Sequence, residues 1–291
     1  MLSIQNLSFS YQRKHPVLHD VSFSLQPGIT LLVGENGSGK STLIQILTGA
    51  LHSKVSVSLN GEIMEDATRK EKMSYLPQEF DFYPSLKVCD VLHFVGTAKG
   101  VEKQRLAQEI KSVAERVNVA DIMRKKVKQC SVGTRRRIGI AAALLGDPQI
   151  VILDEPTAGI DPKERTRFYQ IIKKCFSGKI VLLATHILDD MDILADHVLM
   201  LTGGTITYDG PYHEFKHSLD NRLYQLETAS LTEDERAFID NGILLSQVDS
   251  KDKTIYRVAT SDAAKQFSER CIPVDPTLED IWEYYQRKSN G

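Results

Sequence analysis

Cysteine is scarce in this sequence, and the residues that occur are far apart. The four cysteines, Cys89, Cys130, Cys175 and Cys271, form no Cys-x-x-Cys pair, which argues against a zinc site and against a disulfide framework. An excess of basic charge is also missing, because 36 Lys and Arg face 38 Asp and Glu, a net charge of −2. Proteins that bind nucleic acid usually carry a basic excess, so we expect no nucleic-acid partner.

Long apolar runs are missing as well. No run reaches the length that a bilayer requires, and the N-terminus lacks the charged and apolar regions of a signal peptide, so we expect a cytoplasmic chain. The chain has 291 residues, 42% of them hydrophobic and 25% charged, which is enough for a full core and for two domains. Because the composition changes near His217, we expect the domains to span residues 1–216 and 217–291.

What the sequence does contain is a phosphate-binding loop. Residues 31–42 read Leu-Leu-Val-Gly-Glu-Asn-Gly-Ser-Gly-Lys-Ser-Thr, an apolar strand that runs into the pattern Gly-x4-Gly-Lys-Ser. The glycines allow a tight backbone whose N–H groups converge, and the following helix adds the positive end of its dipole. Lys40 supplies a charge for the β- and γ-phosphates, and the Ser41 hydroxyl can ligate Mg²⁺. The pattern predicts a nucleotide site made of Gly34, Asn36, Gly37, Ser38, Gly39, Lys40, Ser41 and Thr42.

The apolar pattern predicts an α/β fold around this loop. Two alternating segments, residues 2–11 and 17–25, predict an antiparallel hairpin. The continuous apolar runs 150–153 and 180–184 are typical of strands buried on both faces, and residues 162–175 between them are helical in pattern. These three segments therefore predict a βαβ unit of a parallel sheet.

Two further regions are distinguished by their patterns. Residues 79–145 carry helical periodicity and predict a helical subdomain. Beyond residue 217, shorter segments predict a small α+β domain with strands at 223–228, 243–248 and 254–259 and helices at 232–241, 262–270 and 277–287. In the last of these helices, Leu278, Ile281, Trp282 and Tyr285 share one face, which we expect to pack within the chain rather than on a partner.

Two adjacent carboxylates, Asp154 and Glu155, follow the apolar run 150–153. Parallel sheets present their ligands at the carboxyl ends of strands, where consecutive side chains point in different directions. We assign Asp154 to Mg²⁺ and Glu155 to polarisation of an attacking water. The alternative is that Asp154-Glu155-Pro156 only starts a turn, and the phosphate-binding loop earlier in the chain favours the functional interpretation.

Five shorter elements complete a pattern over residues 2–211: Tyr11, Gln78 in Leu-Pro-Gln, Cys-Ser-Val-Gly-Thr at 130–134, Ala-Gly-Ile-Asp at 158–161, and His186 in Ala-Thr-His. With the phosphate-binding loop and the carboxylate pair, in this order, they resemble the nucleotide-binding subunit of an ATP-binding cassette (ABC) transporter. The resemblance implies a P-loop NTPase core of the ABC type, with an antiparallel β subdomain and a helical subdomain. It implies that ATP and Mg²⁺ are bound.

The resemblance also implies roles for residues outside the loop. Tyr11 stacks on adenine, Gln78 senses the metal and the γ-phosphate and is also a metal ligand, and His186 is the switch histidine beside the catalytic Glu155. The signature residues Ser131 and Gly133 face the nucleotide of the opposite protomer, and the loop that ends at Asp161 contacts the dimer partner.

The signature departs from the family pattern Leu-Ser-Gly-Gly-Gln, because Val132 stands where the family has a glycine. A β-branched side chain resists positive φ and adds bulk near the phosphate. We therefore expect a dimer that closes less well or hydrolyses ATP more slowly. The other catalytic residues are intact, so an active enzyme is expected.

The resemblance implies an ATPase subunit that powers a separate integral membrane permease and pairs with a second ATPase subunit, identical or related. The protein would be peripheral on the inner face of the membrane through the permease, and similarities to bacterial exporters favour export of a peptide, antibiotic or lipid. Alternatives are a non-transport cassette ATPase and a regulatory module that binds ATP without turnover.

Two surface features can be interpreted either as structural or as contacts with a partner. Residues 135–137, Arg-Arg-Arg, predict a solvated helix face, with partner contact second. The apolar residues Phe80, Phe82, Tyr83 and Leu86 either form a docking surface for the permease or pack the helical subdomain. The 217–291 region is a regulatory domain, a dimer contact or inert bulk.

Overall fold

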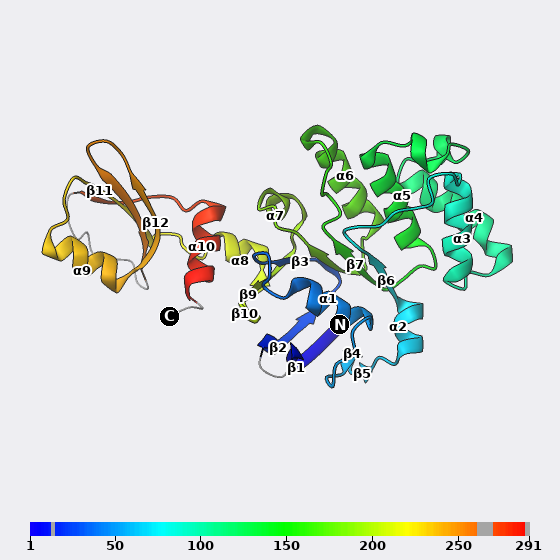
Figure 1. Ribbon diagram of the computed structural model, residues 1–291, viewed down its shortest axis with the longest axis horizontal. Helices are drawn as coiled ribbons and strands as arrows, with labels where there is room; N and C mark the ends of the chain where they lie inside the picture. Colours follow the sequence, from blue (N-terminus) through cyan, green and yellow to red (C-terminus); the bar gives the residue numbers. More distant parts are fainter. Residues whose placement is uncertain (13–14, 261–269, 289–291) are drawn as a thin grey trace. The chain divides into compact units, whose positions relative to one another are not determined.

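The computed structural model describes residues 1–12, 15–260 and 270–288. They fall into two units, Met1–Ile206 and Thr207–Gly291, and each is described here by itself. In Figure 1 the first unit runs from blue through green and the second from yellow to red. The functional boundary expected at residue 216 stays a prediction.

A six-stranded sheet forms the centre of the first unit. Its strand order is β10-β9-β3-β8-β7-β6, with the bounds Gly28–Val33 (β3), Met73–Leu76 (β6), Ile150–Asp154 (β7), Ile180–Ala184 (β8), His197–Thr202 (β9) and Thr205–Pro211 (β10). The five strands from β9 to β6 pair in parallel. The apolar runs of β3, β7 and β8 are buried, as expected for strands covered on both faces. The predicted βαβ unit is present as β7, α6 (Pro162–Cys175) and β8.

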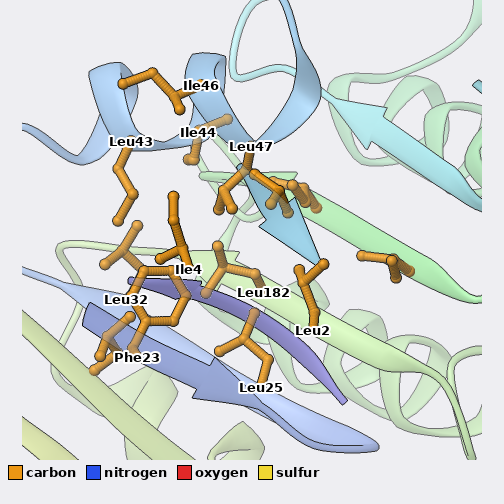
Figure 2. Close-up of a cluster of buried hydrophobic side chains, with 14 of the residues drawn as sticks. Leu2, Ile4, Phe23, Leu25, Leu32, Leu43, Ile44, Ile46, Leu47 and Leu182 are labelled. Carbon is orange, nitrogen blue, oxygen red and sulfur yellow. The ribbon is translucent and has the colours of Figure 1, made fainter. Parts of the chain in front are cut away.

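An antiparallel sheet lies beside the phosphate-binding helix α1 (Lys40–Thr48). Its order is β2-β1-β4-β5, with the bounds Leu2–Gln12 (β1), His15–Leu25 (β2), Val57–Leu59 (β4) and Glu62–Ile63 (β5). Strands β1 and β2 form the predicted hairpin. Figure 2 shows how Leu43, Ile44 and Leu47 of α1 pack against side chains of this sheet and of the parallel sheet. Burial of these side chains holds the start of α1 at a fixed place above the strands.

Helices fill most of the region between β6 and β7. They are α3 (Val88–Ala98), α4 (Lys103–Arg116), the short 3-10 turns at Ala120–Ile122 and Val127–Gln129, and α5 (Val132–Leu144); a further helix, α2 (Asp66–Lys72), precedes β6. Helix α5 begins at Val132 because the Ser131 side chain caps it. Lys99 ties this subdomain to β6: its Nζ donates to Ser74 Oγ and to the carbonyls of Ala142, Ala143 and Leu145.

The α/β fold class, with its antiparallel and helical subdomains, is confirmed. No helix among residues 1–12, 15–260 and 270–288 combines the length and the apolar character that crossing a bilayer demands. All four cysteines are free thiols.

The second unit is an α+β assembly around the antiparallel sheet β12-β13-β11-β14. Its elements are α8 (Tyr212–Lys216), β11 (Leu223–Thr228), α9 (Glu233–Asn241), β12 (Ile243–Asp249), β13 (Thr254–Ala259), β14 (Cys271–Pro273) and α10 (Leu278–Lys288). The helix expected at 262–270 lies outside the described residues, apart from Arg270.

The last helix, α10, packs within its own unit. Ile281 is buried, and the Tyr285 ring stacks on Phe215 with centroids 5.4 Å apart. Asp280 forms an ion pair with Arg257 of β13 at 2.7 Å. The apolar face predicted for this helix is therefore covered by its own chain.

Candidate nucleotide site

Four loops leave the same edge of the parallel sheet. They follow the carboxyl ends of β3, β6, β7 and β8, and they carry the phosphate-binding loop, Gln78, Glu155 and His186 in turn. Because these strands are neighbours that run in parallel, their carboxyl ends form one edge. Four segments that are far apart in the sequence therefore meet at one site.

The phosphate-binding loop needs glycine at two of its positions. Gly39 caps α1 with φ +104°, and a Cβ there would lie 2.8 Å from Leu18 Cδ2. A Cβ on Gly34 would overlap the carbonyl oxygen of Leu201. Gly39 requires a left-handed backbone, and Gly34 lies where two backbone segments of the chain approach closely, so neither position tolerates a larger residue.

A cavity of about 270 Å³ opens above this loop. Its lining brings together nine of the predicted residues, Asn36, Gly37, Gly39, Lys40, Ser41, Thr42, Gln78, Asp154 and Glu155, and adds Val17 of β2. Val17 was missed because nothing in an apolar residue of a hairpin strand distinguishes a cavity wall from the core. Ser38 does not line the cavity, and its buried Oγ has no hydrogen-bond partner.

Lys40 is folded back onto its own loop. Its Nζ donates to the carbonyls of Gly34 at 2.6 Å and Glu35 at 2.9 Å. Burial lowers the pKa of Lys40, while the nearby carboxylates of Glu155, Asp154 and Glu35 act in the opposite direction. An ammonium group held this way can exchange carbonyl acceptors for phosphate oxygens without leaving the cavity.

Asp154 is suited to a cation. Burial, and then the adjacent charge of Glu155, raise the pKa of Asp154, although the Tyr75 hydroxyl donates to it at 3.4 Å. A divalent cation would relieve this repulsion. In the part of the chain that the structure describes, no group of three His, Cys, Asp or Glu side chains is placed to hold a metal. The donor set of Ser41 and Asp154 fits Mg²⁺ because this ion is usually held by one or two protein oxygens together with substrate phosphates.

Glu155 is the centre of a hydrogen-bonded cluster. Its Oε2 accepts from Gln78 Nε2 at 3.0 Å, and its Oε1 lies 2.9 Å from His186 Nδ1. Its backbone has φ +45°, a conformation that side chains rarely adopt, and its N–H donates to the Ala184 carbonyl at 2.9 Å. Of the three residues predicted to be catalytic, Gln78 and His186 thus each contact Glu155 directly. A strained backbone such as that of Glu155 is typical of functional sites.

Tyr11 lies beside the start of α1. Its hydroxyl is 3.3 Å from Thr42 Oγ1, its ring meets that of Phe9 edge-on at 5.1 Å, and the residue is 58% exposed. An exposed ring next to the phosphate-binding helix is free to take a flat ligand on its open face. Its role in stacking on adenine stays a prediction.

The signature residues and Asp161 do not line this cavity. Ser131 caps α5 and accepts from the Thr134 N–H at 3.2 Å, Gly133 is buried against Glu164, and Asp161 caps α6 by accepting from the Lys163 N–H at 2.9 Å. Each residue therefore has a structural role in its own chain. Contacts with a nucleotide on an opposite protomer stay a prediction.

The expectation of a positive φ at residue 132 is wrong. Val132 is the first residue of α5 and is not among the residues with positive φ. A helical φ is negative and suits valine, so the substitution causes no backbone strain. The concern about bulk remains, because the side chain is 43% exposed at the start of the signature helix.

Arg136 is a site residue that sequence reasoning missed. Its Nη1 donates to the Gln78 carbonyl at 2.7 Å, its Nη2 donates to the Ala158 carbonyl at 3.3 Å, and the guanidinium lies 5.2 Å from the centre of the Phe80 ring. A solvated face is the wrong interpretation for this arginine. It bridges the loops that follow β6 and β7.

In the aromatic segment that follows Gln78, some residues pack the helical subdomain and others are exposed, as a docking surface would require. Phe80 packs against α5, where a Cβ on Gly139 would lie 2.5 Å from Cζ of its ring, and the centres of the Phe80 and Phe82 rings are 5.3 Å apart. Tyr83 is 77% exposed. Phe80 therefore packs the helical subdomain, while Tyr83 stays available to a partner.

Fold and site together define a protein that binds a nucleoside triphosphate through a phosphate-binding loop. The family model described as "ABC transporter" matches residues 18–158. The uncharacterized ABC transporter ATP-binding protein YxlF of Bacillus subtilis is 32% identical over 228 residues, covering 78% of this chain and 76% of the relative. The chain therefore belongs to the ABC transporter family, as an ATP-binding protein.

Other relatives agree with this assignment. The linearmycin resistance ATP-binding protein LnrL of Bacillus subtilis is 32% identical, with 70% of this chain and 67% of the relative covered. The lantibiotic transport ATP-binding protein SrtF of Streptococcus pyogenes is 36% identical, with 73% and 91% covered. A solved ATP-binding subunit of an ABC transporter shares the fold with a TM-score of 0.64 at 24% identity, covering 75% of this chain and 92% of that one.

Proposed function

We propose that this chain hydrolyses ATP at the edge of its parallel sheet and that hydrolysis drives export through a separate membrane permease. The observation that carries the proposal is the cluster around Glu155, in which Gln78 and His186 both contact the carboxylate at the mouth of the phosphate-binding cavity. A module that only bound ATP would need the loop but not this arrangement.

Each residue of the site has a definite task. The backbone N–H groups of the loop and Lys40 bind the polyphosphate, and Ser41 and Asp154 would hold Mg²⁺. When bound, the cation neutralises charge on the phosphate oxygens. Glu155 accepts the proton of the attacking water, and Gln78 and His186 keep its two oxygens oriented.

The partners follow from the family and from the names of the relatives. An ATP-binding protein of this family works with a membrane permease, and we propose that the chain docks on one from the inner face of the membrane. We further propose that a second ATPase subunit, identical or related, completes each nucleotide site with Ser131, Gly133 and Asp161. The names of LnrL and SrtF support export of a peptide or a similar antibiotic compound. Residues 1–216 would form the ATPase domain and residues 217–291 an accessory domain.

The proposal is tested by removing the proposed base. Glu155→Gln should bind Mg·ATP as tightly as the wild type and should release phosphate about 100-fold more slowly or worse. The matched control is Glu79→Gln, an exposed acid beside Gln78, which should turn over at the wild-type rate. Phosphate release by Glu155→Gln at the wild-type rate, or none from the wild type, would contradict the proposal and favour a regulatory module.

Coupling to a membrane protein needs a separate experiment. The tagged full chain is purified from solubilised membranes, and the proteins that accompany it are identified by mass spectrometry. We expect an integral protein with several membrane-spanning segments. Recovery of ribosomes or nucleic acid in its place would favour a non-transport cassette ATPase.

A further inference from the structure

Asp190 is a fully buried carboxylate that the proposed chemistry does not use. It lies in the short helix α7 (Asp189–Leu194) and has 0% of its surface exposed. Its Oδ2 accepts from Thr185 Oγ1 at 2.7 Å and from Thr157 Oγ1 at 3.2 Å, and its Oδ1 accepts from the Tyr169 hydroxyl. A buried carboxylate is costly unless its oxygens are hydrogen-bonded, so the three hydroxyls are needed to keep it in place.

The two threonines on Oδ2 belong to the catalytic loops. Thr157 follows Glu155 by two residues, and Thr185 directly precedes His186. One carboxylate oxygen therefore joins the loop after β7 to the loop after β8. Glu155 and His186, which contact each other at 2.9 Å, are the side chains that these two loops present.

Thr185 also shapes the turn that holds His186. Its Oγ1 accepts from the Ile187 N–H at 3.0 Å while it donates to Asp190. The backbone on both sides of His186 is thus fixed by one hydroxyl, in the manner of a turn closed by a threonine side chain. Loss of the Asp190 contact would free this hydroxyl and the turn with it.

We infer that Asp190 is a positioning residue for ATP hydrolysis: its Oδ2 clamps Thr157 and Thr185 so that His186 stays in contact with Glu155. The inference rests on the proposed function. Tyr169 anchors the other oxygen from helix α6 and belongs to neither catalytic loop. Oδ2 of Asp190 therefore contacts the two catalytic loops, whereas Oδ1 only anchors the carboxylate to helix α6.

This asymmetry supplies a matched pair of variants. Thr185→Val and Tyr169→Phe each remove one hydroxyl from the same buried carboxylate with little change of shape, so both should lower the melting temperature. Thr185→Val should lower kcat about tenfold with KM within about threefold of wild type, because Thr185 lies outside the cavity and a small displacement of a catalytic group is expensive. Tyr169→Phe should have a kcat within about twofold of wild type. Thr185→Ser keeps the hydroxyl that Thr185→Val removes, so it should retain most of the wild-type activity.

The outcomes separate the inference from the proposed function. Wild-type kcat in Thr185→Val, or an equal loss in Tyr169→Phe, overturns the inference and leaves ATP hydrolysis intact. A wild-type protein without phosphate release overturns both. Should Thr185→Val fail to fold, Thr157→Val makes the same test from the Glu155 side against the same control.

Discussion

Replacing Arg136 with Met should slow ATP turnover roughly 5- to 30-fold while ATP binding stays close to wild type. Arg136 donates from Nη1 to the Gln78 carbonyl at 2.7 Å and from Nη2 to the Ala158 carbonyl at 3.3 Å. Methionine keeps an apolar side chain over the Phe80 ring and removes both hydrogen bonds. The change therefore releases the backbone of the residue that holds Glu155.

The shorter hydrogen bond decides the magnitude. A hydrogen bond from a charged donor contributes about 1.5 to 3 kcal/mol, and the 3.3 Å contact is long enough to add little. Burial lowers the pKa of Arg136 even though Glu155 acts in the opposite direction, so desolvation offsets part of this gain. A net loss of about 1 to 2 kcal/mol in the positioning of Gln78 corresponds to roughly a 5- to 30-fold lower kcat.

The assay is steady-state phosphate release at saturating Mg·ATP, with binding of a fluorescent ATP analogue measured in parallel. Arg135→Met is the matched control, because Arg135 carries the same charge one residue earlier on α5 and should change kcat by less than about threefold. A kcat for Arg136→Met within twofold of wild type would refute the reasoning. An equal loss in Arg135→Met would assign the effect to charge alone.

Three further predictions concern the signature, the loop and the helical subdomain. Val132→Gly should raise steady-state turnover and leave ATP affinity of the monomer unchanged, and equal turnover in the two proteins would contradict a steric role for the valine. Gly34→Ala should lower the melting temperature and abolish ATP binding, because the new methyl group overlaps the Leu201 carbonyl; normal binding would refute this. Burial lowers the pKa of Lys99 from its ordinary value of 10.5 to about 8. Between pH 8 and 10.5 the unfolded chain therefore binds more protons than the folded chain does. The free energy of unfolding, measured in urea, should therefore rise with pH over this range in the wild type relative to Lys99→Met. The difference should grow by up to about 1.4 kcal/mol per pH unit. The same pH dependence in both proteins would contradict this prediction.

The parts of the site that the sequence predicts are those with local signals. The phosphate-binding loop is a contiguous sequence pattern, and Asp154 and Glu155 follow an apolar run whose length marks a buried strand. The hairpin and the βαβ unit have the same kind of signal, because period and turn residues act over a few positions.

The parts that the sequence does not predict depend on contacts between distant segments. Arg136 reaches Gln78 across 58 residues, and Tyr75 reaches Asp154 across 79. Periodicity places a residue on one face of a helix, but it does not say what lies opposite that face. The error at Val132 has a different cause: a glycine in a pattern was interpreted as a need for positive φ, whereas the position is the first turn of a helix, where negative φ is required.

The account depends on Mg·ATP held by the loop above β3, and equilibrium binding tests this most directly. The full chain is titrated with ATP in the presence of magnesium, alongside Lys40→Ala and the exposed-lysine control Lys54→Ala. We predict that wild type and Lys54→Ala retain ATP with the same affinity and that Lys40→Ala weakens binding by about one to two orders of magnitude. No binding by the wild type, or equal binding by Lys40→Ala, would contradict the account.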